Sequence, residues 1–214
     1  MDDSIQKEAE GQFELKAGNM LRASKLCLDN ECWEAGVILL YSLIDAMAWL
    51  WRDPSHEDVT GQDFIQWIDL YMKPEGAIGV NALDLYGARC GLLHSMTGES
   101  KKHRKLEARK VWYSRKVAEG QKWLVQVHMS ETLMPVTVSV DALGHAVEAA
   151  IRRFWDETKT DAQLAERVLA RARTAYFSEG WFGGPPVTQL PDHKPGGDNP
   201  LGLVVVVGGS KDTS

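Results

Sequence analysis

The stretch "GVILLYSLIDAMAWLW", residues 36–51, is the longest apolar run in this chain of 214 residues. It is short for a bilayer crossing and carries Asp45 in its middle, which is typical of a buried helix and not of a membrane span. Because the run is apolar on nearly all sides, we expect a helix from about Cys32 to Trp51 at the centre of the fold. A carboxylate at that depth needs a partner.

The segments on either side of this run predict more helices. Residues 4–28 place apolar side chains among charges at helical spacing, and the turn "DNE" at 29–31 joins them to the central helix as an antiparallel hairpin. We expect further helices at 64–72, 82–96, 117–129, 142–157 and 161–177, with N-caps at Thr60 or Asp63, at Asn81 and at Asp141.

Two short segments predict strands instead. "KVWYSR" (110–115) and "MPVTVSV" (134–140) are rich in β-branched and aromatic residues that alternate with polar ones. The expected fold class is therefore mainly α, an antiparallel helical bundle with a small two-strand β element. We expect one helical domain over residues 1–177, followed at 178–214 by a tail rich in glycine and proline.

Composition excludes several classes of protein. Hydrophobic and charged contents of 44% and 25% are those of a globular protein. The acidic start "MDDSIQKEAE" is unlike a signal peptide, so we expect a cytoplasmic chain that does not interact with a membrane. The three cysteines, Cys27, Cys32 and Cys90, lack a zinc-binding spacing, and we interpret them as buried thiols. No metal and no cofactor are expected.

Positive charge is concentrated in one window. Residues 101–116 hold eight Lys or Arg and one Glu, a net charge of +7 in a chain whose net charge is −6. Affinity for a phosphate backbone comes chiefly from Lys and Arg. The window is therefore a candidate RNA-binding surface, and its alternative interpretation is a solvated face. The candidate RNA-binding residues are Lys101, Lys102, Arg104, Lys105, Arg109 and Lys110.

The motif "RCGLLH", residues 89–94, lies just before this window. A chain with this many arginines and histidines contains about one such pair by chance, so the spacing alone decides nothing. Its context is more informative: Arg89 lies on an apolar helix that faces the helix of Asp45, and a charge there must be paired. On a straight helix Arg89 and His94 point about 140° apart. We expect them to converge only if the helix ends or distorts between them, or if a groove, such as a dimer cleft, wraps around its end.

An arginine followed four to six residues later by a histidine, on a bundle helix close to a loop, resembles the signature of the HEPN superfamily. The resemblance covers residues 5–177 as architecture, although its specific part is about ten residues. It implies a helical domain that usually dimerises, and many members are metal-independent endoribonucleases in toxin–antitoxin, anti-phage or RNA-processing systems. Active members commonly carry a polar residue after the arginine, where this chain has Cys90.

The resemblance implies that Arg89 and His94 are the catalytic pair, supported by Asp45 and Cys90. A ribose 2′-hydroxyl would attack the adjacent phosphorus, with His94 moving the proton and Arg89 stabilising the charge on the phosphoryl oxygens. The implied partners are RNA, a second copy of the chain, and an antitoxin or other protein. Two alternatives stay open: Arg89 and His94 are structural only, or the chain is a non-catalytic HEPN-like dimer that binds RNA, a nucleotide or a partner protein.

Overall fold

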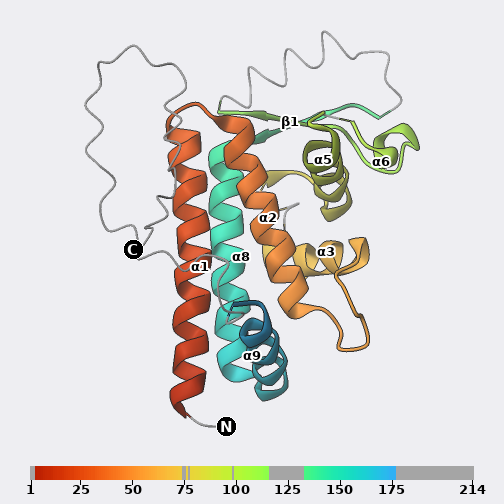
Figure 1. Ribbon diagram of the computed structural model, residues 1–214. Coiled ribbons are helices and arrows are strands. Elements are labelled where there is room, and N and C mark those ends of the chain that lie inside the picture. The colour runs from red at the N-terminus through yellow and green to blue at the C-terminus, as the bar shows by residue number, and fades with distance from the viewer. Residues whose placement is uncertain (1–2, 74–75, 77, 98, 116–132, 177–214) are drawn as a thin grey trace, which may run out of the picture. The chain divides into compact units, whose positions relative to one another are not determined.

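The computed structural model describes residues 3–73, 76, 78–97, 99–115 and 133–176 (Figure 1). The chain divides into two units, Met1–Ser178 and Glu179–Ser214, and the second lies outside the described residues, as does the helix predicted at 117–129. The described elements are α1 (Asp3–Asp29), α2 (Trp33–Trp51), α3 (Gly61–Trp67), η1 (Ile68–Met72), α5 (Ala82–Ser95), α6 (Lys101–Arg104), β1 (Val111–Ser114), β2 (Val136–Ser139), α8 (Val140–Thr160) and α9 (Ala162–Tyr176). The chain is mainly helical, as predicted.

Helices α1 and α2 lie side by side, and a glycine allows their close approach (Figure 1). A Cβ atom on Gly36 would lie 2.6 Å from Cδ2 of Leu28, so a larger residue there would push the helices apart. At the same crossing the Ser24 hydroxyl donates a hydrogen bond of 2.9 Å to the carbonyl oxygen of Gly36. The predicted helices at 4–28 and 32–51 are confirmed to within one residue at each end.

Helix α2 is central because its neighbours cover it along most of its length. Its buried residues are Gly36, Val37, Leu40, Tyr41, Leu43, Ile44, Met47, Ala48 and Leu50. Among the described helices it is the one long and apolar enough to cross a membrane. Half of that apolar span is buried against other elements of the fold.

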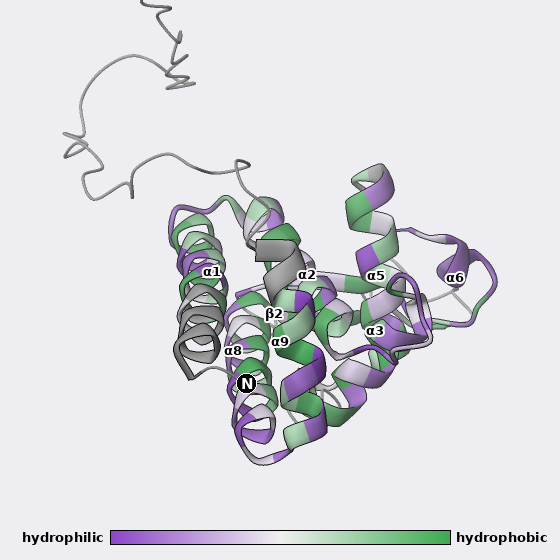
Figure 2. Ribbon diagram, turned by 60° about the horizontal axis from the view of Figure 1, so that its bottom comes forward, coloured by the Kyte–Doolittle hydropathy of each residue, from purple (hydrophilic) through white to green (hydrophobic). Residues whose placement is uncertain are grey.

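Helices α8 and α9 complete the core as amphipathic helices, with green and purple segments along each ribbon in Figure 2. Phe154 of α8 packs edge-on against Tyr71 and Trp67, while Trp155 stacks on Phe13 of α1 at 4.5 Å between ring centroids. The predicted cap of α8 was wrong: Ser139, not Asp141, is the N-cap, and its hydroxyl accepts the backbone N–H of Ala142.

The helix predicted at 64–72 is present as two parts. Thr60 is its N-cap and Asp63 completes a capping box, so both candidate residues take part. The helix begins as α3 and widens into the π-helical turn η1, which ends at Lys73 in the left-handed conformation (φ 49°).

The two predicted strands are confirmed and pair in parallel, with Val111 opposite Val136 and Ser114 opposite Ser139. A parallel pair needs a long crossover connection. Residues 115–135 supply it here, and most of them lie outside the described residues.

The prediction of three buried thiols was wrong. Cys32 is exposed because it lies in the turn before α2, and Cys27 and Cys90 are half-buried. Within the described ranges, no three His, Cys, Asp or Glu side chains are grouped so as to hold a metal ion.

Candidate functional site

Both ends of α5, the helix that carries the "RCGLLH" motif, are fixed by local interactions. At the start, the Asn81 side chain accepts the backbone N–H of Asp84, and the Asp84 carboxylate accepts that of Asn81, which confirms the predicted cap. At the end, Met96 adopts the left-handed conformation (φ 50°), and the chain turns back so that Thr97 donates to the carbonyl oxygen of Gly91.

Two glycines let the following segment pack closely on α5. A Cβ atom on Gly91 would lie 2.7 Å from the carbonyl oxygen of Thr97, and one on Gly87 would lie 2.7 Å from Nε2 of His103. These contacts bring the loop after α5, and the start of the basic window, directly against the helix that carries Arg89 and His94. The motif and the basic window are therefore neighbours in space as well as in sequence.

Arg89 forms an ion pair with Asp45, the buried acid that the sequence suggested as its partner. The Nε and Nη2 atoms of Arg89 donate to Oδ2 of Asp45 at 2.9 and 2.7 Å. The two side chains are only 20% and 21% exposed, so α2 and α5 are tied together at a half-buried point. The pair is a predicted contact that the geometry confirms.

The pair changes the proton affinity of both groups. Burial raises the pKa of Asp45 above its ordinary value, and the hydrogen bond and charge of Arg89 reduce that rise. Burial lowers the pKa of Arg89, but the hydrogen bond and charge of Asp45 outweigh it, so the pKa of the guanidinium lies above its ordinary value. Arg89 is therefore a fixed positive charge.

His94 lies within reach of the same guanidinium. The Nη1 atom of Arg89 is 3.1 Å from Nε2 of His94, and His94 is exposed in the last turn of α5. A guanidinium has donors only, so in this hydrogen bond Nε2 of His94 takes the place of the acceptor. The expectation that the pair needs a helix break or a dimer cleft was wrong, because the long arginine side chain bridges the angle within one chain.

Cys90 faces a different set of neighbours. It is half-buried and interacts with the side chains of both Tyr86 and Arg89. Burial raises the pKa of the Tyr86 hydroxyl, and the interaction with Cys90 raises it further. The side chain at the position after the arginine thus contacts one residue of its own helix and the guanidinium of Arg89.

The basic window divides into side chains with different partners. Lys102 and Lys105 both form ion pairs with Glu107, which neutralises part of their charge. Arg109 donates through Nε and Nη2 to the buried carboxylate of Asp84, so it fastens the loop to the start of α5. The remaining candidates differ in exposure: Lys101 and Arg104 are exposed, and Lys110 is half-buried.

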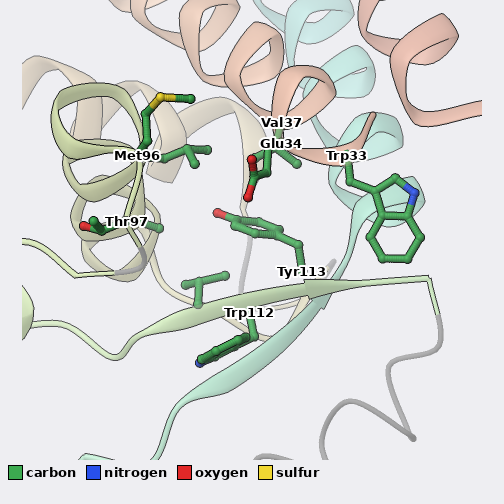
Figure 3. A pocket seen from close by; sticks show the side chains of 10 residues that line it. Trp33, Glu34, Val37, Met96, Thr97, Trp112 and Tyr113 are labelled. Carbon is green, nitrogen blue, oxygen red and sulfur yellow. The ribbon is translucent and has the colours of Figure 1, made fainter. Parts of the chain in front are cut away.

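A cavity that the sequence gave no reason to expect opens between α2, α5 and β1 (Figure 3). Its volume is about 280 Å³. The residues that line it are Trp33, Glu34, Val37, Ala88, Leu92, Met96, Thr97, Val111, Trp112 and Tyr113. Ala88 and Leu92 line it from one face of α5, one turn apart, and Met96 lines it from the C-cap of that helix. The cavity and the Arg89–His94 pair are therefore two features of one helix.

The hydroxyl groups of Tyr113 and Tyr41 hydrogen-bond to each other behind this cavity. Burial raises the pKa of both hydroxyls, so both stay protonated at neutral pH. Tyr113 and Trp112 lie on opposite faces of β1, as alternation along a strand requires (Figure 3). The alternation along β1 was predictable from the sequence. Which face of β1 packs against α2 was not.

Comparison of the chain with family models, with curated proteins and with solved structures found no match in any of the three.

Proposed function

We propose that this chain is a HEPN-like, metal-independent endoribonuclease. The observation that carries the proposal is the contact of Arg89 with both Asp45 and His94, which sets a fixed positive charge beside an imidazole at an exposed helix end. These two groups are what transfer of a phosphoryl group to a ribose 2′-hydroxyl needs. The arrangement of α1, α2, α5 and α8, proposed here to be the antiparallel HEPN-like bundle, supports the same interpretation.

In the proposed reaction, Nε2 of His94 takes the proton of the 2′-hydroxyl as the oxygen bonds to the adjacent phosphorus. The Nη1 atom of Arg89 exchanges its hydrogen bond with His94 for one with the phosphoryl oxygens. The Nε and Nη2 atoms stay hydrogen-bonded to Asp45. The bond from phosphorus to the 5′-oxygen breaks, and that oxygen takes a proton. The products are a 2′,3′-cyclic phosphate and a 5′-hydroxyl end, and DNA is spared because it lacks the nucleophile.

A second copy of the chain is part of the proposal, because the 5′-oxygen needs an acid and His94 of one chain has become occupied with the first proton. A twofold axis beside the exposed end of α5 would bring in the imidazolium form of the partner subunit's His94, which gives its proton to the 5′-oxygen and is left neutral. Light scattering at tens of micromolar tests this step. A dimer is expected, and a strictly monomeric species contradicts the composite site.

The proposed substrate is cytoplasmic RNA, bound in part by the exposed Lys101 and Arg104 beside the motif. Resemblance to the HEPN superfamily supports a role in a toxin–antitoxin or anti-phage system, with an antitoxin or other protein as the neutralising partner. An acidic partner surface would compete with RNA for the same positive charges.

One observation favours a second candidate, a non-catalytic HEPN-like dimer that binds RNA, a nucleotide or a protein. Cys90 occupies the position where active members commonly have a polar residue, and here it interacts with Tyr86 and Arg89. In this alternative the Arg89–Asp45 pair holds α2 to α5 and no bond is cleaved.

The test is incubation of purified protein with a mixture of structured and single-stranded RNA in EDTA. We expect wild type to cleave and His94→Ala to leave the RNA intact. The matched control is His145→Ala, since His145 is an exposed histidine on α8. If wild type and both variants bind RNA and leave it equally intact, the nuclease is excluded and the binding alternative stands.

A further inference from the structure

The cavity between α2, α5 and β1 has no part in the proposed cleavage, and its size limits what it can hold. At about 280 Å³ it lies just below the range of pockets for drug-sized ligands, roughly 300–1,000 Å³. It therefore suits one small ring system and not an extended ligand.

The lining of the cavity limits the chemistry of the ligand. Its walls are apolar and aromatic, apart from Thr97, the Tyr113 hydroxyl and Glu34. Glu34 is the one charged residue among the described residues that line it, so a phosphate group is excluded from the interior by charge. A flat ligand whose edge donates hydrogen bonds fits both the walls and the carboxylate.

Tyr113 is held in place before any ligand arrives. Its hydroxyl is hydrogen-bonded to that of the buried Tyr41, which fixes the orientation of the ring. Figure 3 shows this ring below the Glu34 carboxylate, between α2 and the end of α5. Stacking on a ring that is already ordered costs little conformational entropy.

The rings do not form a cage for a cation. Figure 3 shows Trp33 to one side of Tyr113, and Trp112 on the opposite face of β1. An aromatic cage requires ring faces that converge on one point. Tyr113 with Glu34 instead offers one stacking surface and one pair of acceptors.

We propose that this cavity binds a guanine base. A carboxylate presents two acceptors side by side, and among the four RNA bases guanine alone presents two adjacent donors, N1–H and N2–H₂. Adenine and cytosine have a ring nitrogen that accepts hydrogen bonds beside their amino group. That ring nitrogen would face an oxygen of the Glu34 carboxylate, which is also an acceptor. Guanine therefore makes two hydrogen bonds where the other bases make one at most.

The base comes either from a free nucleotide or from an RNA strand, and the second source rests on the proposed function. Ala88, Leu92 and Met96 present the cavity on one face of α5, next to Arg89. An RNA strand that places a guanine in the cavity would pass around the end of α5 to reach His94. The cavity would then select the sequence that is cleaved.

The binding is tested with nucleosides, which contain no phosphodiester bond to cleave. Calorimetric titration of the full-length His94→Ala protein compares guanosine, inosine, adenosine and cytidine. We expect guanosine to bind, inosine to bind more weakly because it lacks the 2-amino group, and the other two to bind at least tenfold more weakly than guanosine. Equal binding of all four nucleosides, or none at millimolar concentration, overturns the proposal.

Glu34 provides the matched variant, because it is exposed and its replacement leaves the core intact. Glu34→Gln is expected to weaken guanosine binding about tenfold or more, since one acceptor becomes a donor. The control is Glu166→Gln, an exposed glutamate on α9 that does not line the cavity. Guanosine binding that is equal in both variants overturns the role of Glu34 and with it the proposal.

A last comparison separates the two sources. If the base belongs to RNA, a tetranucleotide that contains one guanine binds His94→Ala more tightly than guanosine 5′-monophosphate does. Tighter binding of the monophosphate overturns the RNA source. Guanosine binding together with intact RNA in the wild-type assay would refute the nuclease and leave the cavity assignment standing.

Discussion

Two arginine–aspartate pairs anchor α5, and they differ in how fully each is buried. The Asp84 side chain, in the first turn, is 2% exposed and pairs with Arg109. The Asp45 side chain is 21% exposed and pairs with Arg89 in the middle of the helix. The carboxylate of the first pair lies in the interior while its arginine is 36% exposed, whereas both side chains of the second pair are about one-fifth exposed.

The hydrogen bonds of the two pairs differ in the same way. Asp84 accepts the backbone N–H groups of Arg109 and Asn81 as well as the Arg109 guanidinium, so its interactions are those of a structural anchor. Both hydrogen bonds from Arg89 to Asp45 end on Oδ2, and the guanidinium of Arg89 also reaches the exposed His94. Similar chemistry thus anchors the start of the helix at Asp84, and in its middle leaves part of the Arg89 guanidinium in contact with an exposed histidine.

The largest expected effect distinguishes the two acids by stability. Asp84→Ala should lower the free energy of unfolding by about 3 kcal/mol or more, because it removes a buried partner and half of a capping box. Asp45→Ala should lower it by about 1–2 kcal/mol, since solvent reaches the Arg89 left behind. Urea unfolding measures both. Equal losses of unfolding free energy in the two variants would contradict the view that Asp84 is a structural anchor and Asp45 is not.

The next effect distinguishes the two arginines by activity. Arg89→Lys keeps the charge but loses the planar donors, so RNA cleavage should fall about 100-fold. Arg109→Lys is the matched control and should change the cleavage rate of the folded protein by less than about threefold, because Arg109 is held by Asp84. Single-turnover cleavage on RNA in excess enzyme gives both rates. A similar loss in the two variants would remove the special role of Arg89.

A smaller effect concerns pH and Asp45. Its pKa is raised in the fold, so the stability it contributes is fully present below the ordinary value of 3.8 and is lost as pH rises through the raised pKa. Asn does not ionise, so the stability of Asp45→Asn relative to wild type should rise over that interval. Unfolding curves between pH 3 and about 6 test the sign. If the stability of Asp45→Asn relative to wild type falls as pH rises, the raised pKa of Asp45 is contradicted.

The smallest effect is expected at Cys90. Because its side chain touches Arg89 from the side, Cys90→Ser should keep the interactions with Tyr86 and Arg89 and change cleavage by less than about twofold. RNA cleavage by Cys90→Ser is compared with cleavage by Gly144→Ala. The latter is the control, because a Cβ atom on Gly144 of α8 would contact nothing within 4 Å. A large gain in Cys90→Ser would show that the thiol limits catalysis.

Local patterns predicted the elements and one contact of the site. The Asn81 cap, the two strands and the central helix each follow from a few adjacent residues. The Asp45–Arg89 pair was predictable from the sequence because a charge on each of two apolar helices has few other partners.

Longer-range geometry was not predictable in the same way. Helical angles separate Arg89 from His94, and only the reach of the arginine side chain brings them together. Arg109 was expected to face RNA, yet Asp84, 25 positions away, holds it. The cavity depends on which face of β1 meets α2, and no periodicity within either element specifies that.

The chemical ends of the RNA fragments give the most direct test of metal-independent cleavage through the 2′-hydroxyl. In EDTA, wild-type protein should convert an RNA into fragments with 2′,3′-cyclic phosphate and 5′-hydroxyl ends, detected by mass spectrometry, and should leave the all-deoxy counterpart intact. His94→Ala should produce none of these fragments. The proposed cleavage by His94 is contradicted if wild type and His94→Ala give the same products, or if wild type leaves the RNA uncut.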